Sequence, residues 1–127
     1  MEKQIKPTEA ELEILHILWQ TGPASVKFVN DTLQAKKPVG YTTTLKIMQI
    51  MTQKGILKRE KTGKSHLYIP VLQEHETQNA LINKLLETAF GGSALNLVMQ
   101  ALGNRKTSNE EIEQIKEFLD HLQGEQK

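Results

Sequence analysis

The chain has 127 residues, no cysteine and a formal net charge of +1. This length allows one compact domain, or one small domain with an appendage. The lack of cysteine excludes disulfides and thiolate metal clusters, and no apolar run approaches the roughly 18 residues of a membrane span. The N-terminal residues form no apolar signal segment. We therefore expect a soluble cytoplasmic protein without membrane insertion.

The charge is distributed unevenly along the chain. Residues 1–72 carry 11 Lys and Arg against 6 Asp and Glu, a net charge of +5, whereas residues 73–127 carry 5 against 9, a net charge of −4. Residues 27–64 alone contain nine basic side chains and two acidic ones. The basic half is a candidate polyanion binder, although a solvated lysine-rich surface has the same composition.

Two helices and a turn are predicted at the start of the chain. Thr8 and Glu11 have the spacing of a capping box, which predicts a helix that ends at Gly22-Pro23. Ser25 is a good cap for a second helix, and residues 35–40 predict a turn because Pro38 and Gly40 both resist helix. The inward apolar positions, at three- and four-residue spacing, are Leu12, Leu15, Leu18, Trp19, Val26, Val29 and Leu33; Phe28 lies off the second stripe.

A third helix is predicted over residues 42–54, with two faces of different chemistry. Thr44, Met48 and Met51 share one face with Leu45 and Thr52 beside them, which indicates packing. The opposite face carries Thr42, Lys46, Gln49 and Gln53. Gln, Lys and Thr side chains can contact the edges of bases in the major groove. A solvated polar face is the alternative, but a position after a short helix and a turn favours DNA reading.

A basic hairpin follows, because the sequence after Gly55 alternates toward two strands joined at residues 61–65. Gly63 supplies the turn, Lys61 and Lys64 lie near the tip, and Arg59 lies on the shoulder, where a phosphate backbone would pass. The sequence does not match a nucleotide-binding phosphate loop, because that motif needs a glycine where this chain has Lys58. The first 72 residues therefore predict a winged helix-turn-helix DNA-binding domain, in a mostly α fold with a small β-hairpin.

Residues 73–127 are acidic and are predicted to form three short amphipathic helices. Ser93 opens the second of them, and Ser108 with Glu111 has the capping-box spacing before the third. Such helices bury little apolar surface alone, so we expect a dimerisation domain, in which a two-fold dimer completes the core and spaces two reading helices. Packing against the first domain is the alternative. The expected interface residues are Leu81, Leu85, Leu86, Phe90, Leu95, Val98, Met99, Ile115, Phe118 and Leu119.

The residues do not predict an enzyme. The four histidines, at positions 16, 66, 75 and 121, are scattered without a close ligand pair, so we expect no catalytic site, no metal and no cofactor. Two alternatives to a sequence-specific DNA binder stay open. One is a winged helix that docks an acidic protein partner, and the other is a sequence-tolerant nucleoid-type DNA binder.

Four segments carry a resemblance to a known family. They are PTEAELEILHILWQTGPASV, GYTTTLKIMQIMTQKGIL, the hairpin KTGKSHLYIP, and FGGSALNLVMQAL. In this order they resemble the winged-helix repressors of the penicillinase and methicillin-resistance type, a family that also includes copper-responsive repressors. The resemblance extends from about Pro7 to Leu122, and its most specific part is the YTT helix start with the KG helix end.

The resemblance implies a homodimeric transcriptional repressor that binds an inverted-repeat operator with TACA and TGTA half-sites in double-stranded DNA. It places Thr42, Thr43 and Lys46 at the base-reading helix start, and Arg59 and Lys64 on the wing. It also implies control of the chain's own operon, with release when a membrane metallopeptidase sensor triggers cleavage in the dimerisation region.

Two departures from the family pattern concern the signal that would induce release of the repressor. The antibiotic-resistance repressors are cut at an Asn-Phe bond, and the aligned candidate cleavage position here is Gln100-Ala101, which argues against cleavage at this bond and against a β-lactam trigger. The copper-responsive members carry a Cys-rich tail, whereas this chain has no cysteine. Copper sensing through such a tail is excluded, and the inducer stays unassigned.

Overall fold

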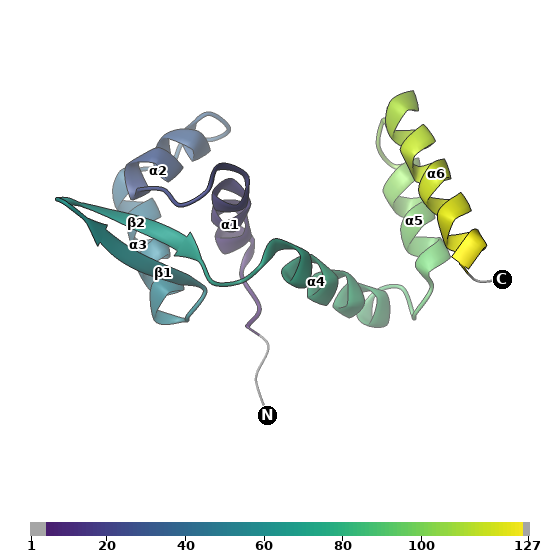
Figure 1. Ribbon diagram of the computed structural model, residues 1–127, viewed down its shortest axis with the longest axis horizontal. Coiled ribbons are helices and arrows are strands. Elements are labelled where there is room, and N and C mark those ends of the chain that lie inside the picture. Colours follow the sequence, from purple (N-terminus) through teal and green to yellow (C-terminus); the bar gives the residue numbers. More distant parts are fainter. Residues whose placement is uncertain (1–4, 126–127) are drawn as a thin grey trace. The chain divides into compact units, whose positions relative to one another are not determined.

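The computed structural model describes residues 5–125, which form six helices and one two-stranded sheet (Figure 1). The helices are α1 (Glu9–Thr21), α2 (Val26–Gln34), α3 (Tyr41–Gln53), α4 (Glu74–Thr88), α5 (Ala94–Gly103) and α6 (Asn109–Glu125), and the strands are β1 (Leu57–Thr62) and β2 (Ser65–Pro70). By the packing of the backbone, the chain divides into two compact units, residues 1–80 and 81–127. Each unit is described by itself below.

The predicted caps of the first two helices are confirmed. The Thr8 hydroxyl accepts from the Glu11 amide at 3.2 Å, and the Glu11 carboxylate accepts from the Thr8 amide at 2.9 Å, so α1 begins with a complete capping box. The Ser25 hydroxyl accepts from the Phe28 amide at 3.2 Å at the start of α2. These bonds satisfy amides that have no partner within their helix.

Helix α3 ends in a glycine motif that turns the chain into the hairpin. Gly55 has φ +83°, the left-handed region that glycine adopts without steric cost. The Ile56 amide donates to the Met51 carbonyl at 2.9 Å, and the Gly55 amide donates to the Thr52 carbonyl at 3.1 Å, which is the Schellman arrangement. Ile56 is fully buried, so the apolar residue after the glycine also anchors the start of β1.

The hairpin has an antiparallel register with a two-residue turn. Thr62 pairs with Ser65, and Leu57 pairs with Pro70 at the other end. Gly63 has φ +62°, and no residue other than glycine in residues 5–125 has positive φ, so the turn follows the II′ pattern that suits twisted strands. A single bridge between Ala24 and Tyr68 attaches β2 to the segment before α2.

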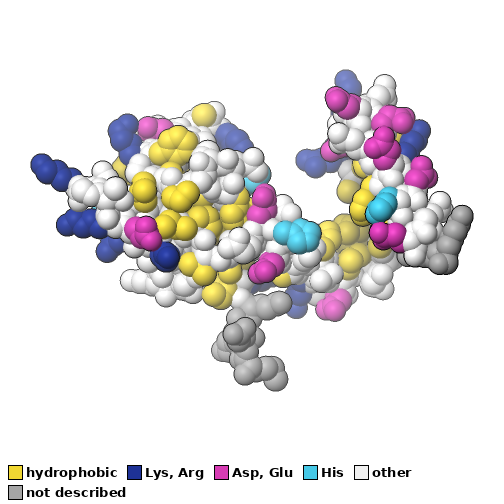
Figure 2. All heavy atoms as spheres, in the orientation of Figure 1, with side chains coloured by type: hydrophobic (Ala, Val, Ile, Leu, Met, Phe, Trp, Pro, Cys, Tyr) yellow, Lys and Arg dark blue, Asp and Glu magenta, His cyan; other side chains and the backbone are white. Residues whose placement is uncertain are grey.

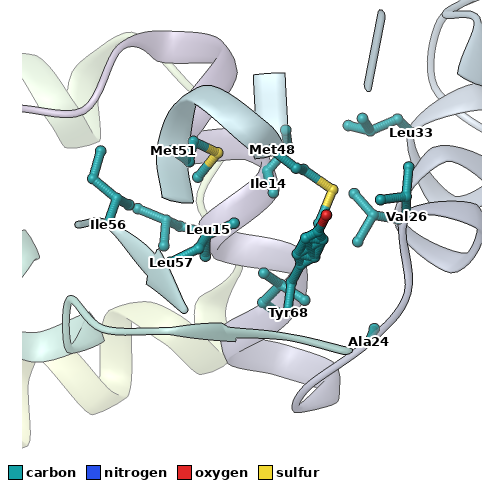
Figure 3. Close-up of a cluster of buried hydrophobic side chains, with 12 residues drawn as sticks. Ile14, Leu15, Ala24, Val26, Leu33, Met48, Met51, Ile56, Leu57 and Tyr68 are labelled. Carbon is teal, nitrogen blue, oxygen red and sulfur yellow. The ribbon is translucent and has the colours of Figure 1, made fainter. Parts of the chain in front are cut away.

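The core of the first unit lies among α1, α2, α3 and the base of the hairpin (Figure 3). Its fully buried apolar side chains include Ile14, Leu15 and Leu18 from α1, Val29 from α2, Met48 and Met51 from α3, and Leu57 and Tyr68 from the hairpin. The α1 stripe is shifted from the expected one, because Leu12 and Trp19 are half-buried whereas Ile14 lies inside. The Trp19 indole Nε1 donates to the Leu72 carbonyl at 3.0 Å.

The second unit has no such core. No residue of α5 or α6 is buried within the described part of the chain. Ser93 and Ser108 accept from the amides three residues later, at 3.0 and 3.1 Å, and so begin α5 and α6. The N-termini of α5 and α6 are therefore capped by local hydrogen bonds, but the two helices have little apolar packing within one chain. Among residues 5–125, no helix is long and apolar enough to cross a membrane.

Candidate nucleic-acid interface

Helix α3 presents the expected polar face to solvent. Thr42, Lys46, Gln49 and Gln53 are all exposed and lie within a narrow sector of the helix. Thr44, Met48 and Met51 on the opposite side are fully buried. The packed face therefore holds the helix by its apolar and small side chains, and it leaves the amide, hydroxyl and ammonium groups free to meet a ligand.

Three exposed residues border this polar face. Thr43 and Ile50 flank it on one side, and Tyr41 at the first position of α3 is half exposed. Neither Tyr41 nor Ile50 was among the residues predicted to contact DNA. Tyr41 could have been identified as a candidate contact from its position directly before the Thr run, at the helix end that would approach DNA first. Ile50 gave no signal, because an apolar residue on a helix is usually counted as core.

The hairpin separates its charges between two faces. Residues that pair across strands share a face, and alternate residues point to opposite faces. Arg59 pairs with the buried Tyr68, and Lys61 pairs with His66, so both cations lie on the face that packs on the core at its base. Lys58 and Glu60 lie on the other face, where the Lys58 ammonium is 3.7 Å from the Glu60 carboxylate. Figure 2 shows Lys and Arg side chains gathered at the hairpin tip.

Salt bridges divide the basic residues of 27–64 into two groups. Lys27 pairs with Asp31 at 3.2 Å, Lys37 with Glu13 at 3.1 Å, Lys54 with Glu11 at 2.8 Å, and Lys58 with Glu60 at 3.7 Å. The other five have no carboxylate within 4 Å among residues 5–125: Lys36, Lys46, Arg59, Lys61 and Lys64. Four of these five are predicted DNA contacts. Their charge is therefore available to an external anion.

The Lys54–Glu11 salt bridge connects two helices of the first unit. The Glu11 carboxylate is almost completely buried, whereas the Lys54 ammonium that contacts it is about two-fifths exposed. Burial by itself raises the pKa of Glu11, but the hydrogen bonds from Lys54 and from the Thr8 amide, with the Lys54 charge, bring this pKa below its ordinary value. The pair ties the C-terminal end of α3 to the start of α1, so it contributes to the placement of α3.

No other grouping of functional side chains stands out. Within residues 5–125, no three His, Asp or Glu side chains gather as a metal site. His75 contacts Asn79 at 3.3 Å and His121 contacts Glu125 at 3.0 Å, both within one helical turn. The predicted contact residues thus lie in two sets on the first unit, one on the exposed face of α3 and one on the hairpin.

The fold and these two surfaces define a winged-helix regulator: a helix-turn-helix with an exposed polar third helix, followed by a basic β-hairpin wing. Residues 7–121 match the family model described as penicillinase repressor. The chain therefore belongs to the penicillinase repressor family. This family consists of transcriptional repressors, so its membership supports a DNA-binding repressor and not an enzyme.

Named relatives align over nearly the whole chain. The penicillinase repressor of Staphylococcus aureus is 24% identical over 120 residues, covering 94% of this chain and 95% of its own. The methicillin resistance regulatory protein MecI of Staphylococcus aureus (strain N315) is 26% identical over 121 residues, with 92% and 95% covered. Among solved structures, a mutant of ZitR from Lactococcus lactis aligns with a TM-score of 0.44 at 20% identity, covering 100% of this chain and 80% of that one.

Proposed function

We propose that this protein is a homodimeric, sequence-specific repressor that binds an inverted-repeat operator in double-stranded DNA. One observation carries the proposal. Among residues 5–125, four of the five unpaired cations in segment 27–64 lie on the exposed polar face of α3, on the core-side face of the hairpin or at its tip, and the fifth, Lys36, lies in the turn before α3. The other four cations of this segment have carboxylate partners. A merely solvated surface gives no reason for this division.

The two surfaces have different tasks in this proposal. Thr42, Thr43, Lys46, Gln49 and Gln53 would meet base edges in the major groove, where Gln suits adenine and Lys suits guanine. Arg59, Lys61 and Lys64 would contact phosphates, which positions the protein without reading sequence. We add Tyr41 and Lys36 as flanking contacts because both are exposed at the start of α3 or in the turn before it. Residues 1–72 then form the DNA-binding domain.

The second unit supports the dimer. Its helices expose large apolar side chains, with Leu95 at 70%, Met99 at 63% and Phe118 at 60% exposure. Leu85, Val98 and Leu119 are exposed as well, and Leu81, Leu86, Phe90 and Ile115 are half-buried. Apolar surface of this extent is a mark of an interaction site. A second copy of the chain is the occupant that would also supply the second reading helix, about 34 Å away for half-sites one turn apart, so we assign residues 73–127 to dimerisation.

Release of the repressor is the last part of the proposal. The resemblance implies a membrane metallopeptidase sensor and control of the chain's own operon. Gln100 and Ala101, which align with the cleaved bond, are exposed on α5 but lack the Asn-Phe chemistry. Mass spectrometry of the intact chain from cells under inducing conditions would show whether this bond is cut.

The experiment that tests DNA recognition is a binding titration with two duplexes of equal length. One carries the DNA upstream of the protein's own gene, including any TACA/TGTA inverted repeat, and the other is its scrambled counterpart, both over a salt series. We expect preferential binding to the first and a linear fall of log affinity with log salt. Equal binding to both duplexes contradicts sequence-specific repression at this promoter and favours a nucleoid-type role. No binding at low salt favours a protein-docking module.

Dimerisation is tested independently of DNA. Leu95→Glu places a charge on the exposed apolar face of α5, and Gln100→Glu places the same charge on the opposite side of that helix. Light scattering should give a dimer mass for the wild type and for Gln100→Glu, and a monomer mass for Leu95→Glu. A dimer mass for Leu95→Glu would remove α5 from the interface.

A further inference from the structure

The helix that carries the polar face begins without a cap of its own. Helices α1, α2 and α5 start with Thr8, Ser25 and Ser93, whose hydroxyls accept from amides of the first turn. The residue before α3 is Gly40, which has no side chain, and no side-chain cap bond forms there. The position of the first turn of α3 must therefore be fixed by something other than its own capping residue.

A buried amide from α2 lies at this point. Asn30 is 6% exposed and Thr44 is fully buried. In the amide orientation that satisfies its neighbours, Asn30 Nδ2 lies 2.6 Å from Thr44 Oγ1 and donates to the carbonyls of Val39 and Gly40 at 3.2 Å each. The Asn30 side chain thus contacts Val39 in the turn, Gly40 at the N-terminal boundary of α3, and Thr44 in the first turn of α3.

Burial makes this arrangement specific. A buried amide without partners is costly, so its hydrogen bonds are satisfied in one geometry and resist displacement. Gln34 Nε2 also donates to the Val39 carbonyl, at 2.6 Å, but this bond is exposed to water. Asn30 is therefore the amide whose bonds the interior protects, and Thr44 connects it to the buried face of α3.

We propose that Asn30, acting through Thr44 and the Val39–Gly40 carbonyls, is a positioning residue that sets the start of α3 for base reading. The proposal rests on the DNA-binding function proposed above. Hydrogen bonds to base edges require donor–acceptor distances within a few tenths of an ångström, so a small shift of Thr42, Thr43 and Lys46 disrupts them. Wing cations attract phosphates over longer distances, and their contribution does not depend on this setting.

The test compares Asn30→Leu with a control of similar thermal stability in the full-length protein. Ile14→Val truncates the core on α1, away from the turn, and serves as the control. Both are titrated, well below their melting temperatures, with the promoter duplex and its scrambled counterpart. Asn30→Leu should lower the ratio of the two affinities about tenfold or more, the loss of one well-aligned base contact. Its affinity for the scrambled duplex and its salt slope should stay at the wild-type values.

A second pair of variants covers the case in which Asn30→Leu does not fold. Thr44→Val removes the buried hydroxyl and keeps the shape, whereas Thr44→Ser restores the hydroxyl. Thr44→Val should reduce sequence preference and Thr44→Ser should keep most of it. In the free protein, hydrogen exchange in Thr44→Val should speed up at the backbone amides of positions 44 and 45 and stay unchanged at Gln53.

Two outcomes overturn the proposal. Retained preference in Asn30→Leu and Thr44→Val would show that the start of α3 is set by other contacts, and an equal loss in Ile14→Val would show that preference merely follows stability. A wild-type protein that distinguishes no duplex would instead contradict the proposed function. In that case, unchanged hydrogen exchange at positions 44 and 45 of Thr44→Val would overturn the positioning role as well. Faster exchange would show that the contact stabilises the start of α3 without a role in base reading, which also overturns the proposal.

Discussion

The two faces of β1 allow a matched test of the wing. Lys58 and Lys61 belong to the same strand, β1, and each carries one positive charge. Lys61 lies on the face of Arg59 and Tyr68 without a carboxylate partner within residues 5–125, whereas Lys58 lies on the other face beside Glu60. Replacing each with Gln removes one positive charge from the same strand. Only Lys61→Gln should remove a phosphate contact.

The expected size follows from counterion release. Each neutralised phosphate contributes about −0.9 to the slope of log affinity against log salt, and the proposed dimer would carry two wings. Lys61→Gln should therefore flatten the slope by about 1.8. If both proteins bind equally at 1 M salt, this corresponds to an affinity about 60-fold lower at 0.1 M salt. Lys58→Gln should leave the slope within error of the wild type.

The assay is a fluorescence-anisotropy titration of a labelled duplex at five or more salt concentrations, with the scrambled duplex in parallel. Lys61→Gln should weaken binding to both duplexes by the same factor, because phosphates carry no sequence information. An equal loss of slope in Lys58→Gln would refute the assignment of faces. The salt dependence would then follow the net charge of the protein and not the position of the charge on the hairpin. An unchanged slope in Lys61→Gln would exclude Lys61 from phosphate contact.

Three further predictions concern reading and stability. Gln49→Ala should lower the preference for the promoter duplex by about 1–3 kcal/mol with little change in the salt slope, measured by the same titrations; an unchanged preference would remove Gln49 from the base-contacting set. Thr8→Ala should destabilise the protein by about 1 kcal/mol through loss of the α1 cap, measured by urea unfolding, and an unaltered midpoint would contradict the capping role. Because the folded-state pKa of Glu11 is lowered, its pair with Lys54 stabilises the fold above the ordinary carboxylate pKa, and this contribution is lost as the pH falls through the folded-state value. Lys54→Met should therefore cost about 1 kcal/mol at pH 7, after a discount for the exposure of Lys54, and less at pH 3 to 4; an equal cost at both pH values would show that the pair adds no charge-dependent stability.

Local signals along the chain predicted the elements that carry the surfaces. The capping pattern at Thr8 and Glu11, the cap at Ser25 and the glycines at 55 and 63 all have the roles that their residue types indicated. The faces of α3 also followed, because the period of 3.6 residues fixes which side chains point together. These features depend on neighbours within a few residues, so one sequence is enough to predict them.

Interactions between distant segments could not be predicted in the same way. Glu11 had an assigned role as a helix cap, but its burial and its bond to Lys54, 43 positions later, depend on how α1 and α3 pack. Asn30 gave no signal at all, because an Asn within a helix is usually exposed, and only the approach of the turn at Val39–Gly40 supplies its partners. Both residues lie where polar groups are enclosed by elements that are separate in sequence.

The second unit shows the opposite relation between sequence and structure. The apolar spacing of α4 to α6 predicted faces that should be buried, and the structure forms the helices yet leaves Leu95, Met99 and Phe118 largely exposed. Helix starts at Ser93 and Ser108 are satisfied locally, so the exposure does not arise from failed helix formation. Burial of such side chains is worth about 1.5–3 kcal/mol each, and a single chain does not provide it. A second copy of the same unit would supply matching apolar faces, so the proposed dimer would bury the side chains that one chain leaves exposed.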